Sequence, residues 1–281
     1  PEYSRPFRQI LDEAKQLIES CTKEITLLGQ NVNAYHGLKE HSTRKQEFGL
    51  GYLIRRIAEI NGLKRLRYIT SHPKDMNDDL ISAHGEVELL MPFLHLPVQS
   101  GSDQVLERMN RQHKVKDYIL VVEKLLSARP ELRLSSDFIV GFPGESDADF
   151  EATISLIREV KFLQAYSFKF SPRPGTPGAT LENQIPSNIK DSRLALLQDI
   201  LLDHQSEFNK SSIGKTVPVL FDRKGRVDGQ LLGRTKFMQP VHANLDDSYM
   251  GQVSQVTIDT ATSNSLGGCV QNEILYYLNP E

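Results

Sequence analysis

Between residues 5 and 170 the chain alternates helical patterns with short apolar runs, and this alternation restricts the possible folds more than any other feature. Helical periodicity is found near residues 6–20, 48–60, 76–84, 102–109, 115–128 and 147–159. The apolar runs lie at 24–28, 65–70, 89–96, 132–140 and 163–170. Strands that alternate with helices form βαβ units with a mainly parallel sheet. Five strands are too few to close an eight-stranded barrel, so we expect an α/β fold with an open or partial (β/α) barrel.

The sequence pattern changes after residue 170. A Pro- and Gly-rich segment at 171–178 interrupts regular structure. A long helix is then expected from Ser187, with an apolar stripe of Leu194, Leu197, Leu201 and Phe208. Beyond Gly214 short alternating runs predict a small all-β barrel. We therefore expect two domains, 1–210 and 211–281, and a polar loop at 39–47.

Charge and cysteine content limit the classes of protein. The formal net charge is −3, which argues against a strongly basic nucleic-acid binder but permits a local basic patch. We expect no membrane partner, since no apolar run could cross a bilayer. Cys21 and Cys269 are the only cysteines; they predict no disulfide framework, fit a cytoplasmic protein and are expected to be packing residues. The chain begins without Met and enters a helix directly, as expected for a fragment of a longer protein.

Polar residues follow four of the predicted strands. Gly29, Gln30 and Asn31 follow the first apolar run, and Thr70-Ser71-His72 follow the second. Gln99 and Ser100 follow the third, ahead of a helix capped by Ser102, with Arg111 just past that helix. The fourth contributes Asp137, Ile139, Val140 and Gly141.

The carboxyl ends of parallel strands meet at one rim, where α/β folds place their sites. Amides and glycines there suit a ligand with hydroxyl and amine groups, and Arg111 suits a carboxylate. Each segment also has a structural interpretation as a capped or polar turn, and His72 alone is more typical of a structural histidine. Jointly the four rim segments predict a ligand site.

A local basic patch lies in the predicted β-barrel. Small barrels with basic loops and exposed aromatic residues suit single-stranded or looped RNA, while a solvated face around a core Phe is the alternative. The candidate RNA-binding residues are Lys215, Arg223, Lys224, Arg226, Arg234, Lys236 and Phe237.

Together these motifs resemble the radical S-adenosylmethionine methylthiotransferases of the MiaB type, which modify tRNA. The resemblance covers essentially the whole chain and rests on Ser4-Arg5-Pro6, the Leu28–Tyr35 segment, the strand ends, Arg173-Pro174-Gly175-Thr176, and Gly233-Arg234-Thr235 of a TRAM domain. It implies a radical-SAM core, S-adenosylmethionine and [4Fe–4S] clusters as cofactors, and the tRNA anticodon arm as partner. The implied reaction is methylthiolation of isopentenyl-adenosine beside the anticodon.

The resemblance also implies roles for single residues. Gly29, Gln30 and Asn31 would lie by the methionyl amino group, and Gln99 and Arg111 would hold the ribose and the carboxylate. Asp137 and the 139–141 turn would line the nucleoside and adenine, and Ser171 would complete the pocket. Ser71 and Ser100 are carried over with their strand ends.

The chain departs from the family at its cysteines. The family holds its catalytic cluster with a Cys-x-x-x-Cys-x-x-Cys loop and a second cluster with three further cysteines, and neither set is in this chain. A cluster needs thiolates in a local group, so the chain alone is expected to be inactive. A monomer is also expected. A methylthiotransferase acting on a ribosomal-protein aspartate and a non-catalytic RNA-binding fragment remain alternatives.

Overall fold

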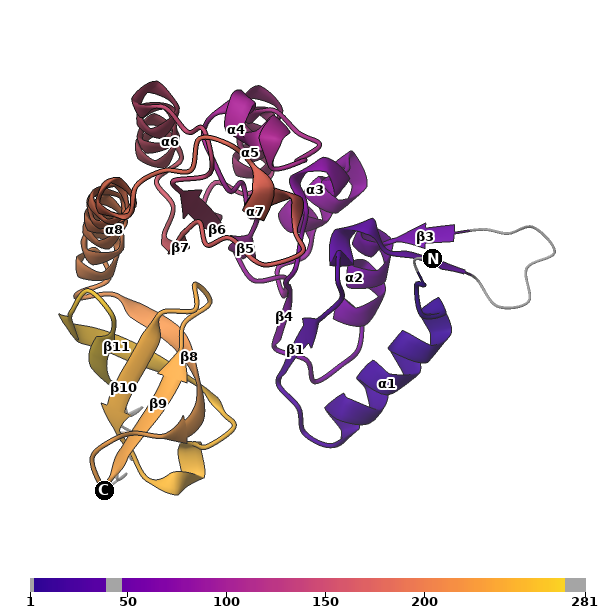
Figure 1. Cartoon of the computed structure of the whole chain (residues 1–281). Coiled ribbons are helices and arrows are strands. Elements are labelled where there is room, and N and C mark those ends of the chain that lie inside the picture. Colours follow the sequence, from indigo (N-terminus) through magenta and orange to yellow (C-terminus); the bar gives the residue numbers. More distant parts are fainter. Residues whose placement is uncertain (1–2, 39–46, 271–281) are drawn as a thin grey trace, which may run out of the picture. The chain divides into compact units, whose positions relative to one another are not determined.

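The computed structural model describes residues 3–38 and 47–270, and the chain divides into two compact units, Pro1–Gln205 and Ser206–Glu281. In the first unit the strands are β1 (Glu24–Leu27), β2 (His36–Leu38), β3 (Glu47–Gly49), β4 (Arg65–Tyr68), β5 (Phe93–His95), β6 (Arg133–Val140) and β7 (Gln164–Lys169) (Figure 1). The helices are α1 (Phe7–Glu19), α2 (Leu50–Ala58), α3 (Asp78–Glu86), α4 (Asp103–Arg108), α5 (Val115–Ala128), α6 (Asp147–Val160) and α7 (Pro177–Thr180), and α8 (Ser187–Lys210) runs from the first unit into the second. The boundary expected near residue 210 stays a prediction.

The five expected strands of the first unit pair in parallel. β1 pairs with β4, and β5, β6 and β7 form a second sheet. A parallel bridge between Leu66 and Leu90 links β4 to the chain just before β5. Helices between successive strands complete the βαβ units, so the expected α/β fold of parallel strands is confirmed.

Along strand β6 the side chains on one face of the sheet are buried in the core, whereas most side chains on the other face are partly exposed. Leu134, Phe138 and Val140 are buried, whereas Asp137 and Ile139 alternate with them and remain partly accessible. Because successive side chains of a strand point to opposite faces, the sheet has an outer face packed on helices and an inner face. Tyr118 of α5 reaches the outer side and donates to the Leu96 carbonyl at 3.0 Å.

Two local elements differ from expectation. β2 and β3 form an antiparallel hairpin on either side of the polar segment at 39–47. Glu47 is therefore in a strand, while residues 39–46 lie outside the described part of the chain. The Pro-rich segment ends in the one-turn helix α7, which starts at Pro177, where the missing N–H of proline costs nothing.

The second unit is the expected small barrel. Its strands are β8 (Thr216–Lys224), β9 (Gln230–Arg234), β10 (Pro240–Asn244), β11 (Val253–Ala261) and β12 (Leu266–Val270), closed in the order β10-β12-β11-β8-β9. Its core includes Val219, Phe221, Val241, Val256 and Ile258. Gln239 is buried and donates to Asn209 Oδ1 at 2.8 Å, which ties the end of α8 to the barrel. Among the described helices none is both long and apolar enough to span a bilayer.

Candidate functional site

The loops that follow β1 and β4 are locked together at the carboxyl rim. Asn33 donates to the His72 carbonyl at 2.8 Å, and the His72 N–H donates to Asn33 Oδ1 at 2.9 Å. Val32 N–H donates to the Thr70 carbonyl at 3.0 Å, and Thr70 Oγ1 donates to the Gly29 carbonyl at 2.5 Å. The first and second predicted rim segments are therefore one rigid unit.

Two polar atoms of this unit have no hydrogen-bond partner among the described residues. They are Asn31 Oδ1 and Ser71 Oγ, both buried. The other end of the Asn31 amide donates to Asp75 Oδ2 at 2.7 Å, which fixes the side chain. Buried polar atoms are almost always paired in proteins, so these two are candidates for contact with a ligand. Gly29 and Gln30, by contrast, are exposed beside an open hollow of about 700 Å³.

The chain after β5 continues along β6 and brings Gln99 to the rim. Gln99 N–H donates to the Asp137 carbonyl, and Ile139 N–H donates to the Gln99 carbonyl, both at 3.0 Å. Gln99 has φ +76°, a strained backbone conformation for a residue other than glycine. Such conformations cluster at functional sites. The Ser100 hydroxyl is turned elsewhere, since it contacts Thr153 of α6 and accepts from the Ser102 N–H. Ser102 caps α4, as expected.

The charged and imidazole groups after β4, after α4 and on β6 interact electrostatically with one another. Burial lowers the pKa of Arg111, and the Asp137 carboxylate opposes that shift. Burial also lowers the pKa of His72, and the Arg111 charge adds to the effect. The His72 ring lies edge-on to His113 with centroids 5.6 Å apart, and the pKa of His113 is lowered mainly by burial. The structure thus brings together residues from the end of β4, the segment after α4 and strand β6, with a cationic Arg111 suited to a carboxylate.

The turn after β6 is held by a buried ion pair. The Gly141 N–H donates to Glu145 Oε2 at 2.7 Å, and Arg193 of α8 donates to the same oxygen at 2.6 Å. Gly141 has φ +69°, which a residue with a side chain adopts only with strain. Val140 is buried in the core, so its side chain is turned away from the inner face. Ser171 is exposed in the loop after β7.

The residues of this chain do not fit an iron–sulfur cluster. Cys21 and Cys269 are both exposed, so the expectation that they pack in the core is wrong. They also belong to different units. Within residues 3–38 and 47–270 no three His, Cys, Asp or Glu side chains are grouped to hold a metal.

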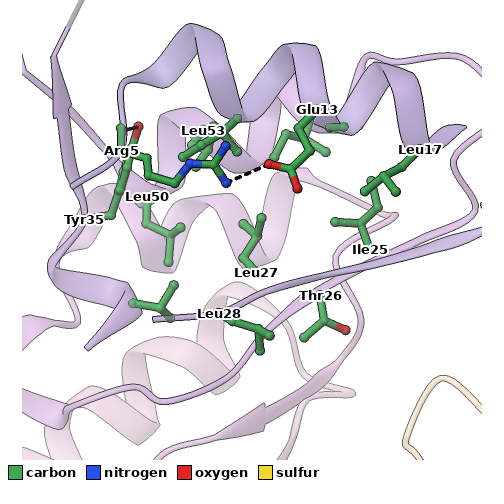
Figure 2. A pocket seen from close by; sticks show the side chains of 14 residues that line it. Arg5, Glu13, Leu17, Ile25, Thr26, Leu27, Leu28, Tyr35, Leu50 and Leu53 are labelled. Carbon is green, nitrogen blue, oxygen red and sulfur yellow. Dashed lines mark hydrogen bonds and ion pairs between the residues drawn. The ribbon is translucent and has the colours of Figure 1, made fainter. Parts of the chain in front are cut away.

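A separate apolar pocket of about 300 Å³ lies between α1, β1 and α2, and sequence reasoning missed it (Figure 2). Leucines and isoleucines form most of its lining, including Leu27, Leu50 and Leu53. The Arg5–Glu13 ion pair, 2.6 Å long and half exposed, crosses its edge. The apolar stripe of the first helix was the available signal, although periodicity alone does not separate a core stripe from a pocket wall.

In the second unit the candidate RNA-binding residues differ in their contacts within the barrel and in their exposure to solvent. Arg223 is paired with Asp222 at 2.9 Å and Lys224 with Asp247 at 2.8 Å. The Phe237 ring is already engaged, with Phe208 at 5.3 Å between centroids and Lys236 Nζ at 5.3 Å from its centroid. Of the remaining candidates, Lys215 and Arg226 are exposed on the barrel, and Arg234 is half-buried.

Comparison with known proteins agrees with this two-part layout. Residues 1–157 match the Radical SAM superfamily and residues 210–270 match the TRAM domain. Over 269 residues the chain is 51% identical to tRNA-2-methylthio-N(6)-dimethylallyladenosine synthase of Maricaulis maris (strain MCS10), covering 95% of this chain and 59% of that protein. It is 53% identical over 267 residues to the protein of the same name from Bartonella bacilliformis, covering 95% of this chain and 57% of that protein.

The chain therefore spans less than three fifths of the length of these curated relatives. Among solved structures, coproporphyrinogen III oxidase (HemN) from Escherichia coli is similar with a TM-score of 0.49 and 12% identity, over 82% of this chain and 60% of that chain. The match over more than half of the chain confirms the resemblance drawn from the strand ends: this protein belongs to the radical SAM superfamily and carries a TRAM domain.

Proposed function

We propose that this chain is the cofactor-binding and RNA-binding part of an enzyme that methylthiolates N6-dimethylallyladenosine beside the anticodon of tRNA. The observation that carries the proposal is the 51–53% identity, over about 95% of the chain, to curated proteins named for that product. The rim of the first unit and the barrel of the second supply the two binding surfaces that such a reaction requires. Cytoplasm, where tRNA is modified, and a monomeric state are part of the proposal.

The rim residues fit S-adenosylmethionine. Arg111 would bind the carboxylate of its methionyl group, and Gln99 would hydrogen-bond the ribose. The unpartnered oxygens of Asn31 and Ser71 would accept from its amine or hydroxyl groups. The Asp137 carboxylate favours the charged form of Arg111 electrostatically. In an enzyme that also holds a reduced iron–sulfur cluster, bound S-adenosylmethionine would supply the radical chemistry, and these residues would bind it, orient it and keep water away.

The barrel would hold the anticodon arm through phosphate contacts. Lys215 and Arg226 are exposed cations available to phosphates, whereas Arg223 and Lys224 must first release their aspartates. Phosphate contacts provide affinity that falls as salt is added. A steep salt dependence of tRNA binding would distinguish an RNA substrate from a protein substrate.

The experiment is conversion of tRNA that carries dimethylallyladenosine but lacks the methylthio group. The longer protein containing this chain, reconstituted with iron and sulfide, is expected to form the methylthio nucleoside, measured by mass spectrometry of digested tRNA. The 281-residue chain given the same treatment is expected to form none, because its cysteines cannot hold a cluster. Conversion of a ribosomal protein instead of tRNA would overturn the proposed substrate, and turnover by the short chain would overturn the expectation that it is inactive alone.

A further inference from the structure

Two large aromatic side chains of β7 are exposed on the inner face of the sheet. Tyr166 is 61% exposed and Phe168 is 55% exposed, two positions apart on one strand. The register places Tyr166 beside Asp137 and Phe168 beside Ile139 of β6. The two rings therefore continue the inner face that carries the candidate cofactor-binding residues.

The alternating side chains of β7, Ser167 and Lys169, make polar contacts with α8. Ser167 accepts from Gln198 at 3.2 Å and Lys169 pairs with Asp191 at 2.5 Å, both on α8. The next aromatic residue, Phe170, packs against Phe142 with ring centroids 4.9 Å apart. Phe168 makes no such ring contact within the described part of the chain. Adjacent exposed aromatic residues on one sheet face indicate an interaction site more often than isolated ones do.

A polar pair borders the two rings. His95 Nδ1 lies 2.8 Å from the hydroxyl of buried Ser135, which fixes the ring, and His95 Nε2 lies 3.6 Å from Asp137 Oδ1. The His95 ring is edge-on to Tyr166 with centroids 6.3 Å apart. The face thus combines a flat apolar surface with a hydrogen-bonding edge, and that edge adjoins Arg111 through Asp137.

We propose that Tyr166 and Phe168 form a platform that binds the substrate base of the tRNA, with its apolar N6 substituent against Phe168. Aromatic side chains stack on unpaired bases of any sequence, at about 1–3 kcal/mol per base. The secondary amine at N6 is a donor, and the Asp137 carboxylate at the border of the platform is an acceptor. A five-carbon alkenyl group has no polar atom, so it requires apolar surface. The inference rests on the proposed function and adds to it the residues that select a prenylated purine.

The test uses the absence of tryptophan from the chain. In the full 281-residue chain, Phe168→Trp keeps an aromatic ring on the platform and provides a single fluorescent reporter. Titration with N6-dimethylallyladenosine is expected to change the emission saturably. Adenosine is expected to bind about tenfold more weakly, because partial burial of the alkenyl carbons is worth roughly 1.4 kcal/mol. Adding Tyr166→Ser to this variant is expected to weaken binding of both nucleosides at least fivefold.

The matched control is Leu120→Trp on α5, where the replaced side chain is 47% exposed but distant from the inner face in the chain's topology. This reporter is expected to show no saturable change. Equal affinity for the two nucleosides, no saturable change in the Phe168→Trp variant, or an equal response in the control would each overturn the platform. Binding of the anticodon arm by the same variants, measured by filter retention, separates the outcomes. If the variants retain the anticodon arm but bind both nucleosides equally, only the platform is contradicted. If the chain without substitutions does not bind the anticodon arm, the proposed function is contradicted.

Discussion

Asn33 and the backbone of His72 hold each other through two hydrogen bonds, of 2.8 and 2.9 Å, that join the loops after β1 and β4. Asn33 is almost fully buried, and its amide matches the peptide group in both directions, since one end donates and the other accepts. Two neighbouring rim segments, 39 residues apart in the chain, are thereby fixed relative to each other. The unpartnered oxygens of Asn31 and Ser71 owe their positions to this pairing.

We expect Asn33→Ala to destabilise the first unit by about 2 kcal/mol, because the partly buried N–H and carbonyl groups of His72 lose their partner. The measurement is urea unfolding, with amide exchange of Val32 as a local probe of the rim. Asn188→Ala, at an exposed asparagine of α8, is the control and should change stability by less than about 0.5 kcal/mol. If the Asn33 variant matched this control, the proposed rigidity of the rim would be wrong.

The buried Glu145–Arg193 pair gives a second prediction. The two side chains are 1% and 8% exposed, and burial raises the pKa of Glu145 although Gly141 and Arg193 oppose the shift. Arg193→Met leaves a buried carboxylate without its cation and should cost about 3–5 kcal/mol. Adding Glu145→Gln should restore much of that loss, because the amide oxygen still accepts from Gly141 while no charge remains. Thermal unfolding of both variants is the measurement, and equal destabilisation of the two would contradict the pairing.

The fold could be predicted from sequence because its signals are local. The helical and apolar periodicities located all five parallel strands, since buried strands and amphipathic helices are visible in a single segment. The β2–β3 hairpin was missed because its three-residue strands are too short to show alternation, and α7 was missed because proline suggested a break.

The candidate site was predictable only in part. Strand ends identify which residues reach the rim, but not where each side chain turns. Ser100 contacts α6 and Val140 packs in the core, while His95 and Tyr166 face inward without any motif to mark them. Side-chain direction depends on register between strands far apart in the chain, and only the structure provides it.

The buried His84 predicts a pH dependence of stability. Its ring is hydrogen-bonded to Tyr68 Oη at 2.7 Å, and burial lowers its pKa from 6.5 to about 3, with the Arg129 charge as a second cause. Below about pH 6.5 the unfolded chain gains a proton that the folded chain does not accept, so stability is lost as the pH falls from 6.5 towards 3. His84→Gln should be less stable at pH 7 but show a shallower loss over this range in urea unfolding.

His72 and His113 also have lowered pKa values and contribute to the same slope, so part of it should remain in the His84 variant. Tyr68→Phe removes the hydroxyl partner but keeps the ring buried and the histidine in place. It should lower stability at pH 7 while retaining most of the slope. An unchanged slope in His84→Gln would show that this histidine is not the group that titrates.

The barrel's ion pairs predict an uneven response of RNA affinity to mutation. Lys215→Ala and Arg226→Ala should each lower the salt slope of anticodon-arm binding by about 0.7–0.9, the value for one phosphate contact. Arg223→Ala should have a smaller effect, because Asp222 already neutralises the guanidinium. Asp222→Ala should tighten RNA binding, because it leaves the Arg223 guanidinium without its carboxylate partner and available to a phosphate. Lys116→Ala on α5 is the control, and a salt slope that responds equally to all these changes would contradict a local RNA face.

Gly101, between β5 and α4, has no room for a side chain. A Cβ there would lie 2.5 Å from the Ala152 carbonyl oxygen and from the Thr153 Cα, both backbone atoms of α6. Gly101→Ala must therefore move the loop or the helix, and it should weaken the 2.9 Å bond from the Gly101 N–H to Thr153. We expect a loss of about 2–3 kcal/mol in urea unfolding. Gly49→Ala is the matched control, since its Cβ would meet nothing within 4 Å and its φ is −77°. Because Gly101 lies just after Gln99 and Ser100 in the rim, equal stability of the two variants would mean that α6 does not position that segment.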